Sequence, residues 1–325
     1  MIVITGGAGF IGSNLAAALD ARGGEPLVIC DRLGSGDKWR NIARRELFDL
    51  VPPEDLLGWL EAHAPQIHMI FHLGAISTTT ERDADAIVAN NFRLSRALWD
   101  WCGRRDIRLI YASSAAVYGD GAQGFDDDPA GLAALRPLNP YGWSKLLFDR
   151  FAVRAAARGA RKPGQWAGLR FFNVYGPHEA HKDGQRSVVH QVWGQVKATG
   201  RCRLFRSHHP DYTDGGQLRD FVSVDDCVDV LLWLHDNPSV SGLFNLGTGK
   251  ARSFADLANA VFAALGTPPA IDYVDTPEAL RAQYQYFTEA RMERLRRAGY
   301  ARPFTALEDG VRDYVARLES ADPWR

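Results

Sequence analysis

The sequence predicts an α/β protein in which a doubly wound parallel β-sheet is joined to a smaller, discontinuous α/β domain. In the first half of the chain, short apolar runs alternate with segments of helical periodicity, which is typical of parallel strands connected by right-handed crossover helices. A glycine-rich segment follows the first apolar run without a gap, as a strand–turn–helix unit requires. The 325 residues suffice for roughly two domains, since one domain takes about 100 to 200 residues.

The first strand and its turn are the best defined elements. Residues 1–4 are apolar and mostly β-branched, and the string TGGAGFIG that follows spaces its glycines like a Rossmann phosphate-binding turn. Glycine permits a positive φ and a close approach to a pyrophosphate, and the next helix offers free N–H groups to the anion. Asp31 lies 19 residues after Gly12, near the spacing of about 20 expected for an acid that binds the adenosine ribose. These residues predict a dinucleotide site.

The further elements are predicted from periodicity and from glycine or proline at their ends. Strands are expected at residues 26–30, 68–72, 107–112, 167–172 and 242–246. Helices are expected at residues 13–22, 53–62, 84–103, 187–199 and 226–235, and from Pro140 onwards. Residues 119–139, rich in Gly, Asp and Pro, are expected to form a loop.

The domain organisation follows from where this alternation stops. From residue 173 to about residue 216 the pattern becomes irregular, and a helix and a strand of the first kind then return. We therefore expect a dinucleotide-binding domain at residues 1–173 and 218–247, and a substrate-binding domain at residues 174–217 and 248–325.

The charge balance points to a small-molecule partner. With 38 basic and 39 acidic residues, the chain lacks the positive excess that binding to nucleic acid or to an anionic membrane needs. No leader segment and no apolar run of about 18 residues is present, which predicts a cytoplasmic protein without membrane association.

The cysteine and histidine pattern favours neither disulfides nor metal. The four cysteines are scattered and form no CxxC pair, so reduced, mostly structural thiols are expected. His178 with His181, and His208 and His209 with Asp211, stand in irregular segments without a complete ligand set. No metal is expected.

A tyrosine and a lysine stand four residues apart in the helix expected from Pro140. Tyr141 and Lys145 therefore project from one face of that helix. A fixed ammonium and a nearby positive nicotinamide ring favour the phenolate, whose ordinary pKa of about 10 is too high for a base at neutral pH. Ser114, just after the strand at 107–112, is placed to hydrogen-bond the same substrate oxygen. The three residues predict proton transfer coupled to hydride transfer.

Four strings in order, TGGAGFIG, YASSAAVYG, NPYGWSK and RFFNVYGP, resemble the nucleotide-sugar branch of the extended short-chain dehydrogenases/reductases. That superfamily includes epimerases, dehydratases and reductases, so membership does not choose the reaction. Dehydratases of this branch place an Asp-Glu pair directly after the serine or threonine of the catalytic triad, whereas this chain has Ala115 and Ala116. An elimination would therefore lack its acid and base.

Further strings are similar to the ADP-L-glycero-D-manno-heptose 6-epimerase family. They are FHLGAISTTTE at 71–81, NVYGPHEAHK at 173–182, QLRDFV at 217–222, FNLGTG at 244–249 and YQYFT at 284–288. In that family NADP+ oxidises the sixth carbon of the heptose, the ketone turns in the pocket, and the hydride returns to the other face. The resemblance implies an ADP-heptose substrate destined for the lipopolysaccharide core. It also implies a homo-oligomer, with a pentamer as the family expectation.

The resemblance assigns the two opposed acid/base groups to Tyr141 and Lys182, with Ser114 and Lys145 assisting. A lysine acts as a base only if burial or a cationic ring lowers its pKa from about 10.4. Asp31 by itself favours NAD, but Arg32 and Lys38 lie close enough to meet a 2′-phosphate, so NADP, tightly bound, is expected and NAD is the alternative.

The sequence patterns and the resemblance together predict the contact residues. The cofactor is expected to contact Gly6, Gly9, Phe10, Ile11, Gly12, Asp31, Arg32, Lys38, Leu73, Gly74, Ala75, Ile76, Ser77, Asn90, Lys145, Val174 and Lys182. The substrate is expected to contact Asn173, Gly184, His190, Gln191, Leu204, Phe205, Arg206, Ser207, Arg219 and Tyr284, with Arg219 a partner for the ADP pyrophosphate.

Some features depart from the family or leave alternatives open. Residues 183–186 replace the small-residue and Met-Ala pattern that usually follows HK, and whether His190 or Gln191 meets the substrate stays open. The segment 207–217 is longer than the corresponding segment of shorter family members. It is expected either to close over the nucleotide or to be a mobile loop. One alternative function is a UDP-hexose 4-epimerase, which should not need Lys182. The other is a non-catalytic regulator that senses a dinucleotide.

Overall fold

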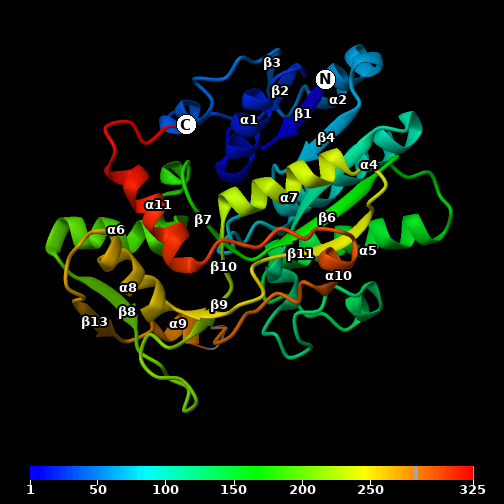
Figure 1. Cartoon of the computed structure of the whole chain (residues 1–325). Helices are drawn as coiled ribbons and strands as arrows, with labels where there is room; N and C mark the ends of the chain where they lie inside the picture. The colour runs from blue at the N-terminus through cyan, green and yellow to red at the C-terminus, as the bar shows by residue number, and fades with distance from the viewer. Residues whose placement is uncertain (282–284, 325) are drawn as a thin grey trace.

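A seven-stranded parallel sheet with flanking helices forms the larger part of the computed structural model, which describes residues 1–281 and 285–324 (Figure 1). The strand order is β11-β6-β5-β4-β1-β2-β3, and each neighbouring pair is parallel. The strands are β1 (Ile2–Thr5), β2 (Leu27–Cys30), β3 (Asp49–Val51), β4 (Met69–His72), β5 (Arg108–Ser114), β6 (Trp166–Phe171) and β11 (Gly242–Leu246). The predicted fold class is confirmed.

The central strands are buried on both faces, which explains their continuous apolar runs in the sequence. Every residue of β1, β2 and β4 is buried, and Ile2, Val3 and Ile4 have no accessible surface. The chain runs outward from β1 through β2 and β3 and then returns to β4 on the other side of β1. Such a reversal opens a crevice at the carboxyl ends of the strands, here those of β1 and β4.

Helices cover both faces of the sheet. The longer ones are α1 (Phe10–Arg22), α2 (Leu56–His63), α4 (Leu94–Arg105), α5 (Pro140–Ala157) and α7 (Val224–Asp236). The short ones are α3 (Ala84–Ile87), η1 (Asp37–Asn41), η2 (Ala64–Gln66), η3 (Val88–Arg93), η4 (Ala115–Tyr118) and η5 (Pro129–Ala133). Helix α7 packs against α1 and crosses in front of the strands in Figure 1, while α5 packs against β5 and η3.

A second lobe has its own apolar core. It contains β8 (Cys202–Phe205) paired with β13 (Ile271–Val274), and the helices α6 (Val188–Thr199), α8 (Phe254–Ala264) and α11 (Leu307–Glu319). Figure 1 shows these elements gathered at the lower left, away from the large sheet. The remaining elements are β7 (Asn173–Tyr175), β9 (Leu218–Arg219), β10 (Phe221–Ser223), β12 (Arg252–Ser253), α9 (Glu278–Arg281), α10 (Glu293–Arg297) and η6 (Ala180–Gln185).

The chain crosses between the lobes more than once. Strand β7 pairs with β10, and β9 pairs with β12, so these short ladders join the two lobes. Ala290, Met292, Leu295 and Tyr300 pack into the larger core, whereas Phe221 packs into the smaller one. The domain boundaries at residues 173, 217 and 247 stay a prediction.

The helix predicted at 84–103 is not continuous. It divides into α3, the π-helical segment η3, and α4, which ends at Arg105. The wide π turn places Asn91 so that its side chain accepts from the N–H of Ile76, donates to its carbonyl, and donates to Ser144. A π segment inside a helix often marks a functional site, and this one ties the segment after β4 to α5.

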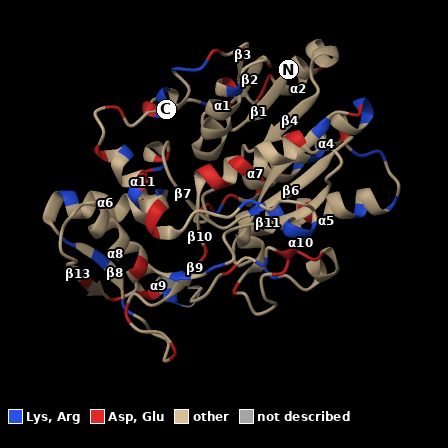
Figure 2. Cartoon of the chain, viewed as in Figure 1, with Lys and Arg blue, Asp and Glu red and all other residues tan. Residues whose placement is uncertain are grey.

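The cysteines and the charged residues are distributed over the whole fold. All four cysteines are buried and free, and burial raises the pKa of the Cys30 thiol to about 12. Basic and acidic residues intermix over both lobes (Figure 2). Among the described residues, no helix combines the length and the apolar character that crossing a bilayer requires.

Candidate active site

A cleft of about 840 Å³ lies at the carboxyl ends of the strands and is bordered by the glycine turn. Gly6 has a φ of 67°, and a Cβ there would lie 2.6 Å from the Cα of Gly74. A Cβ on Gly12 would lie 2.2 Å from the carbonyl oxygen of Gly6. Only glycine allows the turn to pack this closely, and the amino end of α1 then faces the cleft, where its free N–H groups favour an anion. The turn fits a dinucleotide pyrophosphate.

Asp31 supports this turn and stands at the position of a ribose-binding acid. Its Oδ2 accepts a hydrogen bond from the N–H of Ala8 at 3.0 Å. Its Oδ1 accepts from Lys38 Nζ at 2.6 Å, so the carboxylate is already compensated by a cation. The guanidinium of Arg32 instead pairs with Glu54 at 3.0 Å on the surface. Of the two predicted phosphate partners, Lys38 is the one that lines the cleft.

Ser114, Tyr141 and Lys145 line the same cleft, as the sequence predicts. Strand β5 ends at Ser114, and α5 begins where the side chain of Asn139 accepts from the N–H of Gly142 at 2.8 Å. A capping side chain fixes the first turn of a helix, which is the turn that carries Tyr141. Lys145 is buried one turn later, and its Nζ donates to the carbonyl oxygen of Ala112 at 2.8 Å.

The protonation states of Tyr141 and Lys145 depend mainly on their burial. Burial raises the pKa of Tyr141 above its ordinary value, and the hydrogen bond with Ser114 opposes this rise. Burial lowers the pKa of Lys145 to about 8, with the charge of Asp149 acting in the opposite direction. The protein alone therefore favours a neutral phenol, and a positive ring beside Tyr141 is the charge that would favour the phenolate. The Lys145 ammonium stands 5.9 Å from the centre of the Tyr141 ring.

Lys182 comes to this cleft from a different part of the chain, the short helix η6. The segment before it is bound to α1: the hydroxyl of Ser13 lies 2.9 Å from Nδ1 of His178, and Asn14 donates to the carbonyl oxygen of Pro177 at 2.9 Å. Asn41 adds a hydrogen bond to the carbonyl oxygen of His178 at 3.3 Å. These contacts fix the start of η6 beside the glycine turn.

The surroundings of Lys182 suit a lysine that exchanges protons. Burial lowers its pKa below the ordinary value, and the buried carboxylate of Glu179 acts against this shift. Its Nζ lies 5.1 Å above the centre of the Phe10 ring. Glu179 itself accepts from the hydroxyl of Tyr314 at 3.0 Å and from Ser187, and among the described residues no ion pair joins it to Lys182.

The predicted cofactor residues all border the cleft or a pocket beside it. The cleft is lined by Gly6, Gly9, Phe10, Ile11, Gly12, Asp31, Lys38, Leu73, Gly74, Ala75, Ser77, Lys145, Val174 and Lys182. A pocket of about 120 Å³, which shares Asp31 and Gly74 with the cleft, is lined by Arg32, Ile76 and Asn90. The structure thus brings together residues from the glycine turn to η6 that are up to 176 positions apart, from Gly6 to Lys182.

The predicted substrate residues are spread more widely. Gly184 borders both the cleft and a neighbouring hollow of about 760 Å³, which His190 and Gln191 both line. Asn173 is exposed in β7, between the cleft residues Phe172 and Val174. The amide of Gln191 also donates to the carbonyl oxygen of Arg186 at 2.7 Å. The choice between His190 and Gln191 is still open.

The later substrate residues belong to the second lobe. Leu204 is buried in the smaller core, with Phe205 next to it in β8. Arg206 faces Asp275 at 3.8 Å, and the N–H of Ser207 donates to Asp214 at 2.9 Å. The predicted substrate residues that the structure describes here are Leu204, Phe205, Arg206, Ser207 and Arg219, and Tyr284 lies outside the described residues.

Arg219, the predicted pyrophosphate partner, is buried in β9. Its guanidinium stacks 5.5 Å above the ring of Phe254 and donates to the backbone carbonyls of Leu218 and Gln285. Of the predicted substrate residues, only Gly184 borders the cleft that holds Tyr141, among the residues that the structure describes. Substrate contact by the others stays a prediction.

Sequence reasoning missed several residues that shape the cleft. Thr79, Thr80, Phe172, His181 and Gln185 line it. Thr79, Thr80, Phe172 and His181 lie in strings already singled out. They are one to three positions from Ser77, Val174 or Lys182, so this proximity was an available signal. The positions that hold η6 against α1 could not have been found, because their contacts join residues far apart in the sequence.

Comparisons with known proteins agree with this architecture. The model of the NAD dependent epimerase/dehydratase family matches residues 2–247. A relative from Nitratidesulfovibrio vulgaris strain DP4, named ADP-L-glycero-D-manno-heptose-6-epimerase, is 50% identical over 327 aligned residues that cover 100% of both chains. The crystal structure of ADP-L-glycero-D-manno-heptose-6-epimerase from Helicobacter pylori aligns with a TM-score of 0.81 and 28% identity, over 98% of this chain and 96% of that one. UDP-glucose 4-epimerase from Thermus thermophilus, in complex with NAD, aligns with a TM-score of 0.76 and 25% identity, over 98% of this chain and 99% of that one.

Proposed function

The chain belongs to the NAD dependent epimerase/dehydratase family, and we propose that it inverts the sixth carbon of the heptose in ADP-D-glycero-D-manno-heptose. The product is then the ADP-L-glycero-D-manno-heptose that lipopolysaccharide core synthesis uses. Full-length relatives that carry this name, such as the one at 50% identity, support the substrate. The observation that carries the proposal is the meeting of Tyr141 and Lys182, from α5 and η6, in one cleft beside the glycine turn.

Inversion through a ketone needs a proton donor and acceptor on each face of the reacting carbon. A nicotinamide dinucleotide supplies reversible hydride storage when it is bound. Tyr141 takes the hydroxyl proton on one face, while Ser114 holds the same oxygen by a hydrogen bond. After the ketone has turned, Lys182 exchanges the proton of the same oxygen on the opposite face. The buried Lys145 provides a fixed positive charge behind Tyr141.

The residues that would hold the dinucleotide are those of the glycine turn, Asp31 and the wall from Leu73 to Ser77. We propose NADP as its form, because Lys38, 2.6 Å from Asp31, offsets the carboxylate charge that would repel a 2′-phosphate and offers that phosphate an ammonium donor. A cytoplasmic location and a homo-oligomeric assembly, pentameric as in the family, also belong to this proposal.

A direct assay of the sugar tests the reaction. The purified protein, without added cofactor, is incubated with ADP-D-glycero-D-manno-heptose, and the configuration at the sixth carbon is followed by NMR. We expect inversion in the parent protein and its near loss in the Lys182→Met variant. Failure of the parent to invert this sugar, with conversion of UDP-galactose instead, would favour the UDP-hexose 4-epimerase alternative. Full activity of Lys182→Met on the heptose would refute the proposed role of Lys182.

A regulator without catalytic function is tested by the same experiment. It would bind the dinucleotide and convert neither sugar. Ser114, Tyr141 and Lys145 all line the cleft, which supports an active enzyme over this alternative.

A further inference from the structure

A cluster of two histidines and a glutamate lies on the edge of the sheet opposite to the catalytic cleft. Glu25 stands just before β2, His68 just before β4, and His235 near the end of α7. These positions are at the amino ends of the strands, whereas the cleft lies at their carboxyl ends. The proposed epimerase reaction uses none of the three residues.

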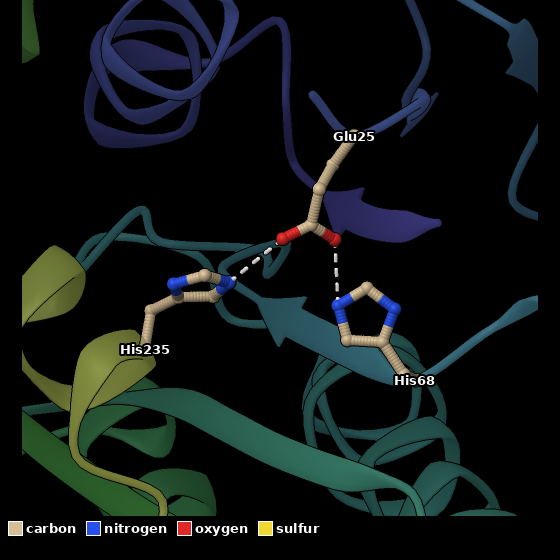
Figure 3. A group of neighbouring side chains, drawn as sticks. All are labelled: Glu25, His68 and His235. Carbon is tan, nitrogen blue, oxygen red and sulfur yellow. Dashed lines mark ion pairs between the residues drawn. The ribbon is translucent and has the colours of Figure 1, made fainter. Parts of the chain in front are cut away.

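The three side chains point toward one another (Figure 3). Nε2 of His68 lies 2.7 Å from Oε2 of Glu25, and Nε2 of His235 lies 3.3 Å from Oε1 of the same carboxylate. All three donor atoms lie within 4.8 Å of one another. Zinc bonds of about 2.0 to 2.2 Å place tetrahedral donors roughly 3.3 to 3.5 Å apart, so small side-chain shifts suffice to admit an ion. The half-exposed side chains of Glu25 and His68 can make those shifts.

Both imidazoles are oriented by a second contact on their other nitrogen. Nδ1 of His235 lies 3.1 Å from the carboxylate of Asp236, which Arg22 holds at 3.0 Å. Nδ1 of His68 lies 3.1 Å from the N-terminal ammonium nitrogen of Met1, which is a donor. Metal-binding histidines usually donate their other ring N–H to an outer contact, and His235 can do so to Asp236, which leaves its Nε2 for the ion. His68 offers Nε2 to an ion once the amino group of Met1 has lost a proton and can accept from Nδ1.

Two of the donor atoms are otherwise unsatisfied. Oε2 of Glu25 and Nε2 of His235 are buried atoms without a hydrogen-bond partner of good geometry among the described residues. A neutral imidazole is the form that binds metal. The guanidinium of Arg108 is directed at the backbone carbonyls of Leu234 and His235.

We propose that Glu25, His68 and His235 bind one divalent transition-metal ion. Two imidazole nitrogens with one carboxylate form a donor set suited to Zn²⁺, with water completing the tetrahedron. The ion would connect the end of α7 to the amino ends of β2 and β4, three segments far apart in the sequence. It would therefore stabilise the folded chain by binding it in preference to the unfolded chain. Its position on the far edge of the sheet leaves the cleft untouched.

Zinc binding to the full chain tests the site. Untagged protein is stripped with a chelator, and ZnCl₂ is titrated against a chromophoric competitor, with thermal unfolding measured at each concentration. We expect one Zn²⁺ per chain and a rise in Tm. The variants His68→Gln, His235→Gln and Glu25→Gln are each expected to weaken binding about 10- to 100-fold or more, since even outer contacts matter on that scale. His63→Gln serves as the matched control, because His63 stacks on Trp59 in α2 outside the cluster.

X-ray absorption at the zinc edge gives a second readout that needs no variant. It should show nitrogen and oxygen neighbours at about 2.0 to 2.2 Å and no sulfur. Zinc bound as tightly to the His68→Gln/His235→Gln double variant as to the parent would overturn the proposal, as would the absence of binding to the parent. A sulfur neighbour would also overturn it, because it would place the ion at a cysteine. None of these results depends on epimerase activity.

Discussion

Replacing Lys38 with methionine is expected to weaken the preference for NADP over NAD. Nζ of Lys38 lies 2.6 Å from Oδ1 of Asp31 and 2.9 Å from the carbonyl oxygen of Arg32. The two side chains of this ion pair are 21% and 11% exposed. With the ammonium present, a 2′-phosphate meets a cation. Without it, Asp31 repels the phosphate and is free to accept a hydrogen bond from a 2′-hydroxyl.

The size of the effect follows from the charges involved. Two unit charges about 5 Å apart interact by about 3 kcal/mol at an effective dielectric constant of 20, and by about 1 kcal/mol in water. Lys38 is partly exposed and shares its charge with Asp31, so screening reduces the larger figure. We expect a change of about 1 to 2 kcal/mol, which corresponds to about 5- to 30-fold in affinity.

Isothermal titration of nucleotide-free protein measures this directly. In Lys38→Met the dissociation constant of NADP should rise by about 5- to 30-fold, while that of NAD stays the same or falls. Arg32→Met is the control, because the Arg32 guanidinium pairs with Glu54 and is 63% exposed. An unchanged NADP-to-NAD ratio in Lys38→Met, or a larger loss in Arg32→Met, would refute the role given to Lys38.

Three further predictions concern the cleft and the core. Lys182→Met should lower the rate of epimerisation by about 10²- to 10⁴-fold, the usual contribution of a general acid or base. The control Lys197→Met removes an exposed ion pair and should leave the rate intact; a loss below threefold in Lys182→Met contradicts the assignment. Arg170→Met should lower the free energy of unfolding by about 3 to 5 kcal/mol, because the fully buried Asp149 loses its ion-pair partner at 3.0 Å. A denaturant titration showing a loss under about 1 kcal/mol would contradict this. Burial lowers the pKa of His72 to about 3, so below pH 6.5 the folded chain binds fewer protons than the unfolded chain, and the free energy of unfolding decreases as the pH is lowered. Between pH 6.5 and 5 this decrease should be smaller by about 1.5 to 2 kcal/mol in His72→Gln than in the parent protein. An equal decrease in both proteins would show that His72 is not the group responsible.

The larger lobe could be predicted well because each of its strands carries a local signal. The apolar runs at β1, β2, β4, β5, β6 and β11 are nearly continuous, since these strands are buried on both faces. The prediction at 242–246 matches β11 residue for residue. The prediction of one continuous helix at 84–103 was wrong. The π turn depends on hydrogen bonds of Asn91 with Ile76 and Ser144, which the periodicity of the sequence does not reveal.

The second lobe was harder to predict because its strands are short. Strand β9 has 2 residues and β7 has 3, too few for a period-two pattern to be recognised. Helices α8 and α11 do have a buried apolar face, formed by residues such as Leu257 and Val311. The sequence predicted the helix at 187–199, which is α6, but placed no elements at α8 and α11. The capping box of Ser253 and Asp256 was a usable signal for the start of α8.

The sequence by itself determined the residues with local patterns: the glycine turn, the spacing to Asp31, and the pairing of Tyr141 with Lys145 on one helix. These depend on the geometry of a single turn or helix, which a short stretch of chain specifies. No local pattern placed Lys182 in their cleft: the family resemblance implied it, and the tertiary structure brings η6 there. Only the tertiary structure decided that Lys38, rather than Arg32, compensates Asp31. It also brought together Glu25, His68 and His235, because contacts between distant segments depend on how the sheet and helices pack and not on any local pattern.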